Sequence, residues 1–433
     1  MQKKKKKSGM LEQVLDRRNI EKALEQVIRN KGSAGVDGME TDELRAYLNS
    51  RWQSLRTKIL EGSYEPAAVR KVEIPKAGGG KRMLGIPTVL DRLLQQAISQ
   101  WLSPKYEEQF SENSYGFRPG KNAHQAVMQA QRYVNEDKVW VVELDLEKFF
   151  DKVNHDRLMS TLSRTIRDKP TLKLIRSYLR SGILEDGVVN GRTEGTPQGS
   201  PLSPLLSNIV LNDLDKELEK RGHSYVRYAD DCSIYVKSEA AAKRLAEGIM
   251  VYIEGKLLLK VNREKTKISR PNESKLLGFT FVQIKGGWEI WIAKTSVGRI
   301  MQKCKSITGR SNGLSEQDRL VKLQTVINGW VNYFVISKAR NVMRDLDSYV
   351  RRRLRMCLWK SWKRAVRRAK ELMKLGISRH WAYKWGSSSK GCWRVAHSQI
   401  LRNSLTNIVF ERRGYIGFAK TYHRKTAAQL SLF

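Results

Sequence analysis

Apolar positions recur at helical spacing over much of the chain, and turn residues separate the repeats. Residues 9–30 show this pattern first, and it stops where "KGSAGVDGM" brings three glycines within seven residues. A helix is therefore predicted to end in a turn at that point. Further helices are predicted at 89–109, in "AHQAVMQAQRYVNED", over most of 156–182, from about Pro201 onward and near 239–256.

Shorter segments with strand character lie between these helices. Residues 68–87 indicate two short strands around a glycine-rich turn, with Pro75 and Pro87 at their edges, and so predict a basic hairpin. Residues 138–158 begin as a buried strand and turn into a helix near Asp151. The segment "YVRYADDCSIYV" has apolar runs on both sides of two aspartates, which favours a second hairpin. Additional strands are predicted near 259–262, 276–284 and 288–292.

The pattern changes from about residue 294, after which helical spacing dominates. The segment at 351–374 holds eleven Lys or Arg and one Glu. We expect it to form one basic helical stretch whose charges repel one another unless RNA phosphate lies alongside. The pattern thus predicts a mixed α/β body of roughly 290 residues followed by a basic helical region.

Charge extends this picture to partners. The 433 residues carry a formal net charge of +37, with 81 Lys or Arg against 44 Asp or Glu. Such an excess opposes compaction unless a polyanion offsets it, so nucleic acid is the first candidate partner. The run Lys3–Lys7 is interpreted as a tail that makes weak phosphate contacts.

Cysteine usage and hydropathy limit the remaining classes. Four cysteines lie far apart without a C-x-x-C pair, so neither a zinc ribbon nor a disulfide framework is indicated. No stretch has membrane-spanning length, and no apolar signal segment follows the lysine run. These features predict a protein of a reducing compartment without a membrane partner.

Candidate chemistry comes from three aspartates. Asp230 and Asp231 fall at the predicted hairpin tip, and Asp145 ends the apolar strand "VWVVELD". Adjacent carboxylates repel, and they remain ionised together when a cation lies between them, for which Mg²⁺ is the natural candidate. Three aspartates around two Mg²⁺ ions predict nucleotidyl transfer.

Taken together in order, these blocks resemble the reverse transcriptases of group II introns, also called maturases. The resemblance covers about residues 10–365. Its blocks are "NKGSAGVDGM", "VEIPKAGGGKRMLGIPTVLDRLLQQAI", "YEEQFSENSYGFRPGKNAHQAV", "VELDLEKFFDKVNHDRL", "GTPQGSPLSPLLSNIVLNDLDKELEKRG", "VRYADDCSIYV", "LKVNREKTKI", "LLGFTF" and "INGWVNYF".

The resemblance implies an α+β, right-hand polymerase of fingers, palm and thumb, with an antiparallel palm sheet and a basic helical C-terminal region. It divides the chain into an N-terminal extension (1–62), fingers and palm (63–292), a thumb and maturase region (293–376) and a small nucleic-acid-binding tail (377–433). No Cys-pair endonuclease module follows, so cutting of a target strand by this chain is not expected.

The same resemblance implies roles at the active site. Asp145 and Asp230 correspond to the principal metal ligands, Asp231 to the third carboxylate, and the Leu146 carbonyl completes one metal shell. Phe150 resembles the aromatic gate that leaves no room for a 2′-hydroxyl, whereas Phe149 is expected in the core.

Residues around the incoming nucleotide follow in the same way. Lys76 and Arg82 resemble the pair that grips the triphosphate, the Arg through a bidentate fork. Gln198 resembles the residue beside the nascent base pair, and Gly195 and Gly199 are expected to let the backbone approach the template. Lys265 corresponds to a proton donor for pyrophosphate, with Lys260 and Lys267 as competitors.

Template and primer contacts complete the implied site. "LLGFTF", with Leu277 and Gly278, resembles the primer-grip hairpin, and Arg118 in "SYGFRP" resembles a template-facing residue. His124 and His155 lack metal-ligand spacing and are interpreted as structural.

The expected function is an RNA-directed DNA polymerase that also binds intron RNA to assist splicing and mobility. Its expected partners are group II intron RNA, an RNA template, a DNA primer and dNTPs, with two Mg²⁺ ions that Mn²⁺ can replace. A bacterial cytoplasmic location is expected, and homodimer formation is left open. Three alternatives remain: an intron-free relative in DNA repair or phage defence, a splicing cofactor without polymerase activity, and an RNA-templated RNA polymerase, which Phe150 disfavours.

Overall fold

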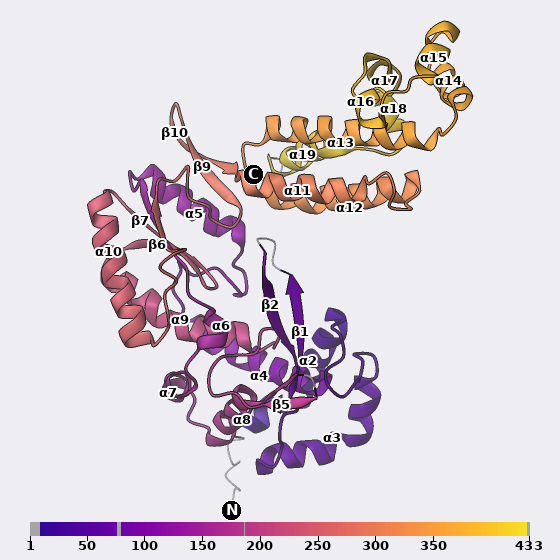
Figure 1. The fold of residues 1–433 in the computed structure, drawn as a ribbon. Helices are drawn as coiled ribbons and strands as arrows, with labels where there is room; N and C mark the ends of the chain where they lie inside the picture. Colours follow the sequence, from indigo (N-terminus) through magenta and orange to yellow (C-terminus); the bar gives the residue numbers. More distant parts are fainter. Residues whose placement is uncertain (1–8, 76–78, 186, 431–433) are drawn as a thin grey trace, which may run out of the picture. The chain divides into compact units, whose positions relative to one another are not determined.

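The computed structural model describes residues 9–75, 79–185 and 187–430. The described residues form two compact units, one that ends at Arg270 and one that begins at Pro271. Figure 1 shows sheets and helices mixed in the first unit, and mainly helices in the second. Among the described residues, no helix combines the length and the apolar character that crossing a bilayer requires.

The N-terminal unit begins with helices that pack into one core with the later sheet. Several of these helices start at a side-chain cap, such as Asp16 before the second helix and the Asn122–Gln125 capping box before the fifth. The helices of this unit are α1 (Met10–Val14), α2 (Arg17–Asn30), α3 (Leu44–Glu61), α4 (Val89–Glu107), α5 (Ala123–Asn135), α6 (Phe149–Lys152), α7 (His155–Thr165), α8 (Lys169–Arg180), α9 (Ser203–Lys220), α10 (Glu239–Tyr252) and the π-helical turn η1 (Ile253–Leu257).

Two four-stranded sheets belong to the same unit. The first has the order β2-β1-β4-β5, in which β1 and β2 form the predicted antiparallel hairpin and β4 joins β1 in parallel. The second has the order β6-β7-β3-β8 and is antiparallel throughout. The strands are β1 (Val69–Pro75), β2 (Lys81–Ile86), β3 (Trp140–Leu144), β4 (Ile183–Glu185), β5 (Val188–Asn190), β6 (Ser224–Tyr228), β7 (Asp231–Val236) and β8 (Lys267–Ser269).

The antiparallel sheet is the frame of the site described below. Val141, Val142 and Ile234 are fully buried in its central strands. Helices α5 and α10 both contact this sheet, and Figure 1 shows α10 running beside the β6–β7 hairpin. Because both central strands are buried, the strand ends hold a constant position at the edge of the core.

The C-terminal unit starts with a two-stranded antiparallel hairpin and continues as packed helices. Helices α12 and α13 both contact α19, and Figure 1 shows α11 and α12 extended along the length of this unit. Its elements are β9 (Phe279–Ile284), β10 (Gly287–Ile292), α11 (Lys294–Ile307), α12 (Glu316–Phe334), α13 (Arg340–Ser361), α14 (Ala365–Lys374), α15 (Arg379–Gly386), α16 (Cys392–Val395), α17 (Gln399–Ser404), α18 (Asn407–Arg412) and α19 (Gly417–Leu430).

Two sequence-based predictions of elements are wrong. No strand spans 259–262. Leu258, just before this segment, has a left-handed φ of 54°, and within the segment only Val261 forms an isolated bridge. The basic stretch 351–374 is two helices, α13 and α14, separated at Trp362. Trp362 is buried and lies edge-on to Trp359, with ring centroids 6.0 Å apart, so aromatic packing accompanies the break.

Candidate active site

The register of the antiparallel sheet brings Asp145 beside the second hairpin. Strand β3 pairs with β7 up to Leu144 and Cys232. Asp145 is the next residue, so it lies level with Asp231, at the spacing of about 5 Å between paired Cα atoms. Tyr228 pairs with Asp231 across the hairpin, which leaves Ala229 and Asp230 as its two-residue turn. Asp145 and Asp230, 85 positions apart in sequence, therefore lie at the same end of the sheet's strands.

A cleft of about 1070 Å³ opens at this edge. Both Asp145 and Asp230 line it, whereas the exposed Asp231 is not part of its lining. Seven predicted site residues contribute to its wall: Arg82, Asp145, Leu146, Phe150, Gln198, Asp230 and Lys265.

The backbone around Asp145 is held on one side by the segment that precedes β8. The Asp145 carbonyl accepts a hydrogen bond from the Asn262 amide at 2.8 Å, and the Glu147 amide donates to the Lys260 carbonyl at 2.8 Å. Leu146 and Val261 are therefore a pair without mutual hydrogen bonds. In such a pair the carbonyl points away from the partner strand, so the Leu146 carbonyl is directed to the side on which β7 lies.

A buried ion pair holds the hairpin tip, and sequence reasoning missed it. The side chains of Arg227 and Asp215 are both fully buried, and their two hydrogen bonds measure 2.7 and 2.5 Å. Another Arg227 nitrogen donates to the Ala229 carbonyl at 2.9 Å and to the Asn208 side chain at 3.0 Å. Burial alone lowers the pKa of the Arg227 guanidinium, but the neighbouring Asp215 carboxylate raises that pKa overall. The tip is thus anchored to α9 by charge and by hydrogen bonds.

The turn itself has a constrained backbone. Ala229 has a φ of 57°, a left-handed conformation that is uncommon for residues other than glycine. The segment before α5 packs so closely over it that a Cβ on Gly116 would lie 2.3 Å from the Ala229 nitrogen. The Tyr115 amide also donates to the Arg227 carbonyl at 2.8 Å. Neighbouring segments therefore hold Ala229, the residue before Asp230, in a conformation of higher energy.

The two phenylalanines after Asp145 have different surroundings. Phe149 is 2% exposed and belongs to the core, while Phe150 is half-buried and forms part of the cleft wall. Their rings meet edge to face with centroids 5.3 Å apart. The prediction that Phe149 is a core residue is confirmed, and the gate role of Phe150 stays a prediction.

The first hairpin brings basic side chains to the same cleft. Arg82 lies on β2 and lines the cleft, and it makes no ion pair within the described part of the chain. Lys76 lies outside the described residues. The Gly85 amide donates to the Gln198 carbonyl at 2.9 Å, so the hairpin is tied to the loop that carries Gln198.

The three candidate lysines for proton donation occupy different positions. Lys265 is exposed and lines the cleft. Lys260 also lines it but forms an ion pair with Glu147 at 3.1 Å. Lys267 lies on β8 opposite Glu143, outside the cleft lining. Lys265 is therefore the best placed of the three.

Gly195 and Gly199 are close to the chain's own backbone, and their expected role toward a template stays a prediction. A Cβ on Gly195 would lie 2.8 Å from the Asp151 carbonyl oxygen, and one on Gly199 would lie 3.0 Å from the Gly85 carbonyl oxygen. Both have a positive φ, of 85° and 119°. The His155 Nε2 is 2.7 Å from the Gly195 carbonyl, which confirms a structural role for that histidine.

The structure corrects the prediction that Arg118 faces a template. Its side chain is 2% exposed, forms an ion pair with Glu107 at 2.7 Å, and donates to the carbonyls of Ser111 and Ser114. Because these partners occupy its donors, Arg118 supports the loop rather than facing a template. Phe117, its neighbour, is 54% exposed, has a φ of 59° and lines the cleft. Sequence reasoning missed Phe117; its place within "SYGFRP" was the available signal.

Leu277 and Gly278 belong to the C-terminal unit. They form a turn with φ angles of 52° and 86° just before β9. The Leu277 carbonyl accepts from the Tyr333 hydroxyl at 2.9 Å, and the Gly278 carbonyl accepts from Ser296 at 3.0 Å. The turn is thus packed on α11 and α12, and its role as primer grip stays a prediction.

The composition suggests a cleft with mainly basic walls, but the described wall of this cleft has equal numbers of basic and acidic residues. Six basic residues in its described wall face six acidic ones: Lys81, Arg82, Lys148, Lys260, Arg263 and Lys265 against Asp145, Glu147, Asp151, Asp230, Glu254 and Glu264. Arg263 pairs with Glu254 at 2.9 Å, as Lys260 does with Glu147. Two of the acids, Asp145 and Asp230, face the cleft from neighbouring strand ends, and their mutual repulsion favours a bound cation between them.

The donors at the cleft suit a hard divalent cation. They are carboxylate and carbonyl oxygens, which Mg²⁺ and Mn²⁺ prefer. The neighbouring soft donor, Cys232, is 4% exposed, and burial raises the pKa of its thiol, so it stays protonated. Within residues 9–75, 79–185 and 187–430, no three His, Cys, Asp or Glu side chains come together in a metal-binding cluster. Joint ligation by all three aspartates therefore stays a prediction.

Comparison with known proteins identifies the family. A family profile described as "Reverse transcriptase (RNA-dependent DNA polymerase)" matches residues 74–281. Protein YkfC of Escherichia coli (strain K12) is 34% identical over 286 residues, which are 57% of this chain and 74% of YkfC. The chain belongs to the reverse transcriptase family. Members of this family generally use divalent metal ions, and the antiparallel sheet with a helical C-terminal region confirms the predicted fold class.

Further matches show similarity to proteins of group II introns over parts of the chain. A profile described as "Group II intron, maturase-specific domain" matches residues 297–376. Group II intron-encoded protein LtrA of Lactococcus lactis subsp. cremoris is 32% identical over 165 residues, 38% of this chain but 27% of LtrA. A solved telomerase structure from Candida albicans is similar over 77% of this chain and 66% of that chain, with 14% identity and a TM-score of 0.42.

Proposed function

We propose that this reverse transcriptase copies RNA into DNA and binds group II intron RNA to assist splicing and mobility. The observation that carries the polymerase assignment is the register of β3 and β7, which brings Asp145 and Asp230 to one cleft. The maturase-specific match at 297–376 supports the intron partner. These matches favour the intron-type enzyme over an intron-free relative or a splicing cofactor without polymerase activity.

The carboxylates define the reacting centre of this proposal. Asp145, Asp230, Asp231 and the Leu146 carbonyl would hold two Mg²⁺ ions, for which Mn²⁺ could substitute. When bound, the ions would favour ionisation of the primer 3′-hydroxyl and offset the charge of the leaving pyrophosphate. The Arg227–Asp215 pair holds the turn that presents Asp230, so the carboxylate position does not depend on a bound ligand.

The remaining cleft residues bind and orient the dNTP. Arg82 grips the triphosphate through its guanidinium fork, together with Lys76, and Gln198 lies beside the nascent base pair. Phe150 contacts the sugar and excludes a 2′-hydroxyl, which selects dNTPs over NTPs. Lys265 gives a proton to the leaving pyrophosphate, since it is exposed on the cleft while Lys260 is paired with Glu147.

The C-terminal unit provides the intron RNA partner surface. Exposed basic residues at the start of α14, including Arg364 and Arg367, have no ion-pair partner within the described part of the chain. Unpaired basic charge on a helix favours phosphate contact. Residues 293–376 are proposed as the thumb and maturase region and 377–433 as a nucleic-acid-binding tail, and homodimer formation and a bacterial cytoplasmic location stay predictions.

Primer extension on an RNA template tests the proposal. We expect incorporation of dNTPs that stops when EDTA removes divalent ions and returns with Mg²⁺ or Mn²⁺. Phe150→Ala should lower the preference for dNTPs over NTPs by about 10- to 200-fold, the effect of removing one steric contact in a selective pocket. Wild-type protein that uses NTPs and dNTPs equally would contradict the gate assignment and favour an RNA-templated RNA polymerase.

A further inference from the structure

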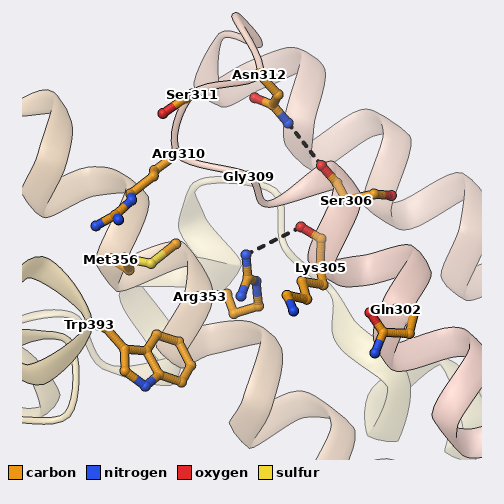
Figure 2. A pocket seen from close by; sticks show the side chains of 10 residues that line it. All are labelled: Gln302, Lys305, Ser306, Gly309, Arg310, Ser311, Asn312, Arg353, Met356 and Trp393. Carbon is orange, nitrogen blue, oxygen red and sulfur yellow. Dashed lines mark hydrogen bonds between the residues drawn. The ribbon is translucent and has the colours of Figure 1, made fainter.

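The C-terminal unit contains a pocket of about 660 Å³ that the polymerase chemistry does not use. It lies where the end of α11 and the loop after it meet α13 and α16. Figure 2 shows the Trp393 indole and the Lys305 side chain on opposite sides of Arg353. The pocket is thus built from segments about 90 positions apart in sequence, all within one compact unit.

One wall of the pocket is aromatic and held in place. The Arg352 guanidinium lies 3.9 Å from the centroid of the Trp393 ring, and its terminal nitrogen donates to the Trp393 carbonyl at 3.4 Å. Trp393 nevertheless keeps 38% of its surface exposed. Met356, 5% exposed, adds an apolar side chain next to this ring. Arg353 lies farther from the same ring, with its guanidinium carbon 5.9 Å from the centroid. An indole held by a close cation and still partly exposed can accept a flat ring.

The opposite wall is cationic. Lys305, Arg310 and Arg353 line the pocket, and the described lining contains no acidic residue. Arg353 is engaged with the end of α11, because it donates to the Thr308 hydroxyl at 2.5 Å and to the Thr308 carbonyl at 3.0 Å. Lys305 and Arg310 are exposed and form no ion pair within the described part of the chain. Their charge is available to an anionic ligand.

The loop that carries Arg310 is ordered by its own hydrogen bonds. Asn312 donates to the carbonyls of Ser306 and Ile307 at 3.0 and 2.8 Å, the first of which Figure 2 shows. The buried Arg319 donates to the carbonyls of Gly309 and Leu314. These bonds lie within the protein itself, so they limit the ordering that the loop would need on binding.

We propose that this pocket binds one unpaired RNA nucleotide, with the base stacked on Trp393 and the adjacent phosphate between Lys305 and Arg310. An aromatic ring beside cations is the arrangement by which proteins bind single-stranded RNA, whereas paired bases cannot reach such a ring. The volume exceeds that of a single nucleotide, and the lack of acids in the described lining suits the phosphate. This assignment rests on the proposed RNA-binding function.

Photocrosslinking of the full chain tests the assignment directly. The probe is a single-stranded oligouridylate that contains one 4-thiouridine, and the readout is the tryptic peptide to which it attaches. We expect attachment to Gly391–Arg394, which contains Trp393. Crosslinks confined to other peptides would overturn the pocket assignment.

Affinity for the same oligouridylate provides the second readout. Trp393→Ala should weaken binding by about 5- to 150-fold, the effect of losing one stacked base, whereas Trp393→Phe should restore most of it. Trp381→Ala is the matched control, because Trp381 is 48% exposed on α15 and lies outside the pocket. An equal loss in both variants would contradict a specific pocket.

The cationic wall is tested with a double variant and a matched control. Lys305→Ala/Arg310→Ala should weaken binding more than Arg299→Ala/Lys303→Ala, which removes the same charge from exposed positions of α11 outside the lining. If wild-type protein extends primers and binds oligouridylate without a crosslink in the pocket, only this inference fails. If it binds no oligouridylate, the proposed RNA-binding function fails as well.

Discussion

The two compact units of this protein use basic residues differently. Lys and Arg outnumber Asp and Glu by 33 to 8 in residues 271–433, but by 48 to 36 in residues 1–270. Most of the net positive charge therefore belongs to the smaller unit. The larger unit has the smaller positive excess, and its acidic residues include those at the cleft.

Three arginines of the two units have different kinds of hydrogen-bond acceptor. In the N-terminal unit, Arg227 pairs with a carboxylate and positions the turn that holds Asp230. In the C-terminal unit, Arg319 and Arg353 donate to backbone carbonyls at the end of α11 and in the loop after it. In the Arg227–Asp215 pair the two opposite charges cancel. The positive charges of Arg319 and Arg353 are not cancelled by the neutral carbonyls that accept their hydrogen bonds. The first arrangement suits an acidic reaction centre and the second suits a polyanion surface.

Removal of a cleft carboxylate should separate the two units most strongly. Asp230→Ala is expected to lower primer extension on the order of 10³-fold, because a charge-stabilising group of the transition state is lost. RNA affinity should stay within about twofold, since the basic C-terminal unit is unchanged. Extension assays and filter binding measure the two quantities. Asp156→Ala is the control, since the Asp156 side chain is 80% exposed. Joint loss of synthesis and RNA binding would mean that Asp230 is structural.

Arg227, which pairs with a carboxylate, and Arg353, which donates to Thr308, should differ in their contribution to stability. Arg227→Met leaves Asp215 unpaired in the interior and should lower the free energy of unfolding by about 3–5 kcal/mol. Arg353→Met removes hydrogen bonds from a partly buried side chain to the Thr308 hydroxyl and carbonyl, leaves no buried charge unpaired, and should cost about 1–2 kcal/mol. Urea denaturation followed by probes in each unit measures both values. Equal costs would remove the distinction drawn above.

Salt dependence should reveal which unit binds phosphates. Arg364→Ala/Arg367→Ala at the start of α14 should reduce the slope of log affinity against log salt by about 0.7 for each phosphate of single-stranded RNA that is no longer neutralised. The control, Arg164→Ala/Arg167→Ala, has the same spacing at exposed positions of the N-terminal unit and should change the slope less. A larger change of the slope in the control would mean that the N-terminal unit contacts the RNA phosphates.

The smallest expected effect is a pH dependence confined to the N-terminal unit. Burial lowers the pKa of His155 below its ordinary value of 6.5, although the Gly195 carbonyl partly opposes the shift. A lowered pKa means that protonation favours the unfolded chain. Stability is therefore fully present above pH 6.5 and decreases as the pH falls toward the lowered pKa.

Thermal unfolding between pH 5 and pH 8 measures this effect. We expect Tm to fall by about 1–2 °C per pH unit below pH 6.5, with a weaker dependence in His155→Gln. His397→Gln, at an exposed position of the other unit, should follow the wild type. An unchanged pH dependence in His155→Gln would exclude His155 as its source.

Local sequence patterns predict the elements around the site well. The hairpin at β1 and β2, the strand before Asp145 and the hairpin at the two aspartates all occur where turn residues and alternation indicate them. These features depend on neighbours in sequence, which a pattern reports directly. The distinction between Phe149 and Phe150 could also be anticipated.

Long-range packing accounts for what the pattern does not predict. The pairing of Arg227 with Asp215 joins a strand to a helix, and nothing in "VRYADD" indicates a buried partner. The sequence around Arg118 and Gly195 favours template contacts, but carbonyls and backbone of other segments occupy the space around both residues. The break at Trp362 has no glycine or proline signal, since it accompanies the burial of an aromatic ring.

The convergence of Asp145 and Asp230 on shared divalent ions is tested most directly by iron-mediated cleavage of the polypeptide. Fe²⁺ substituted for Mg²⁺ generates hydroxyl radicals in the presence of ascorbate, and these cut the backbone close to the ion. We predict cuts near Asp145 and near Asp230 in the same sample, both suppressed by excess Mg²⁺. Cleavage at only one of these segments, or cleavage that Mg²⁺ does not suppress, would contradict a shared metal site at the end of β3 and the β6–β7 turn.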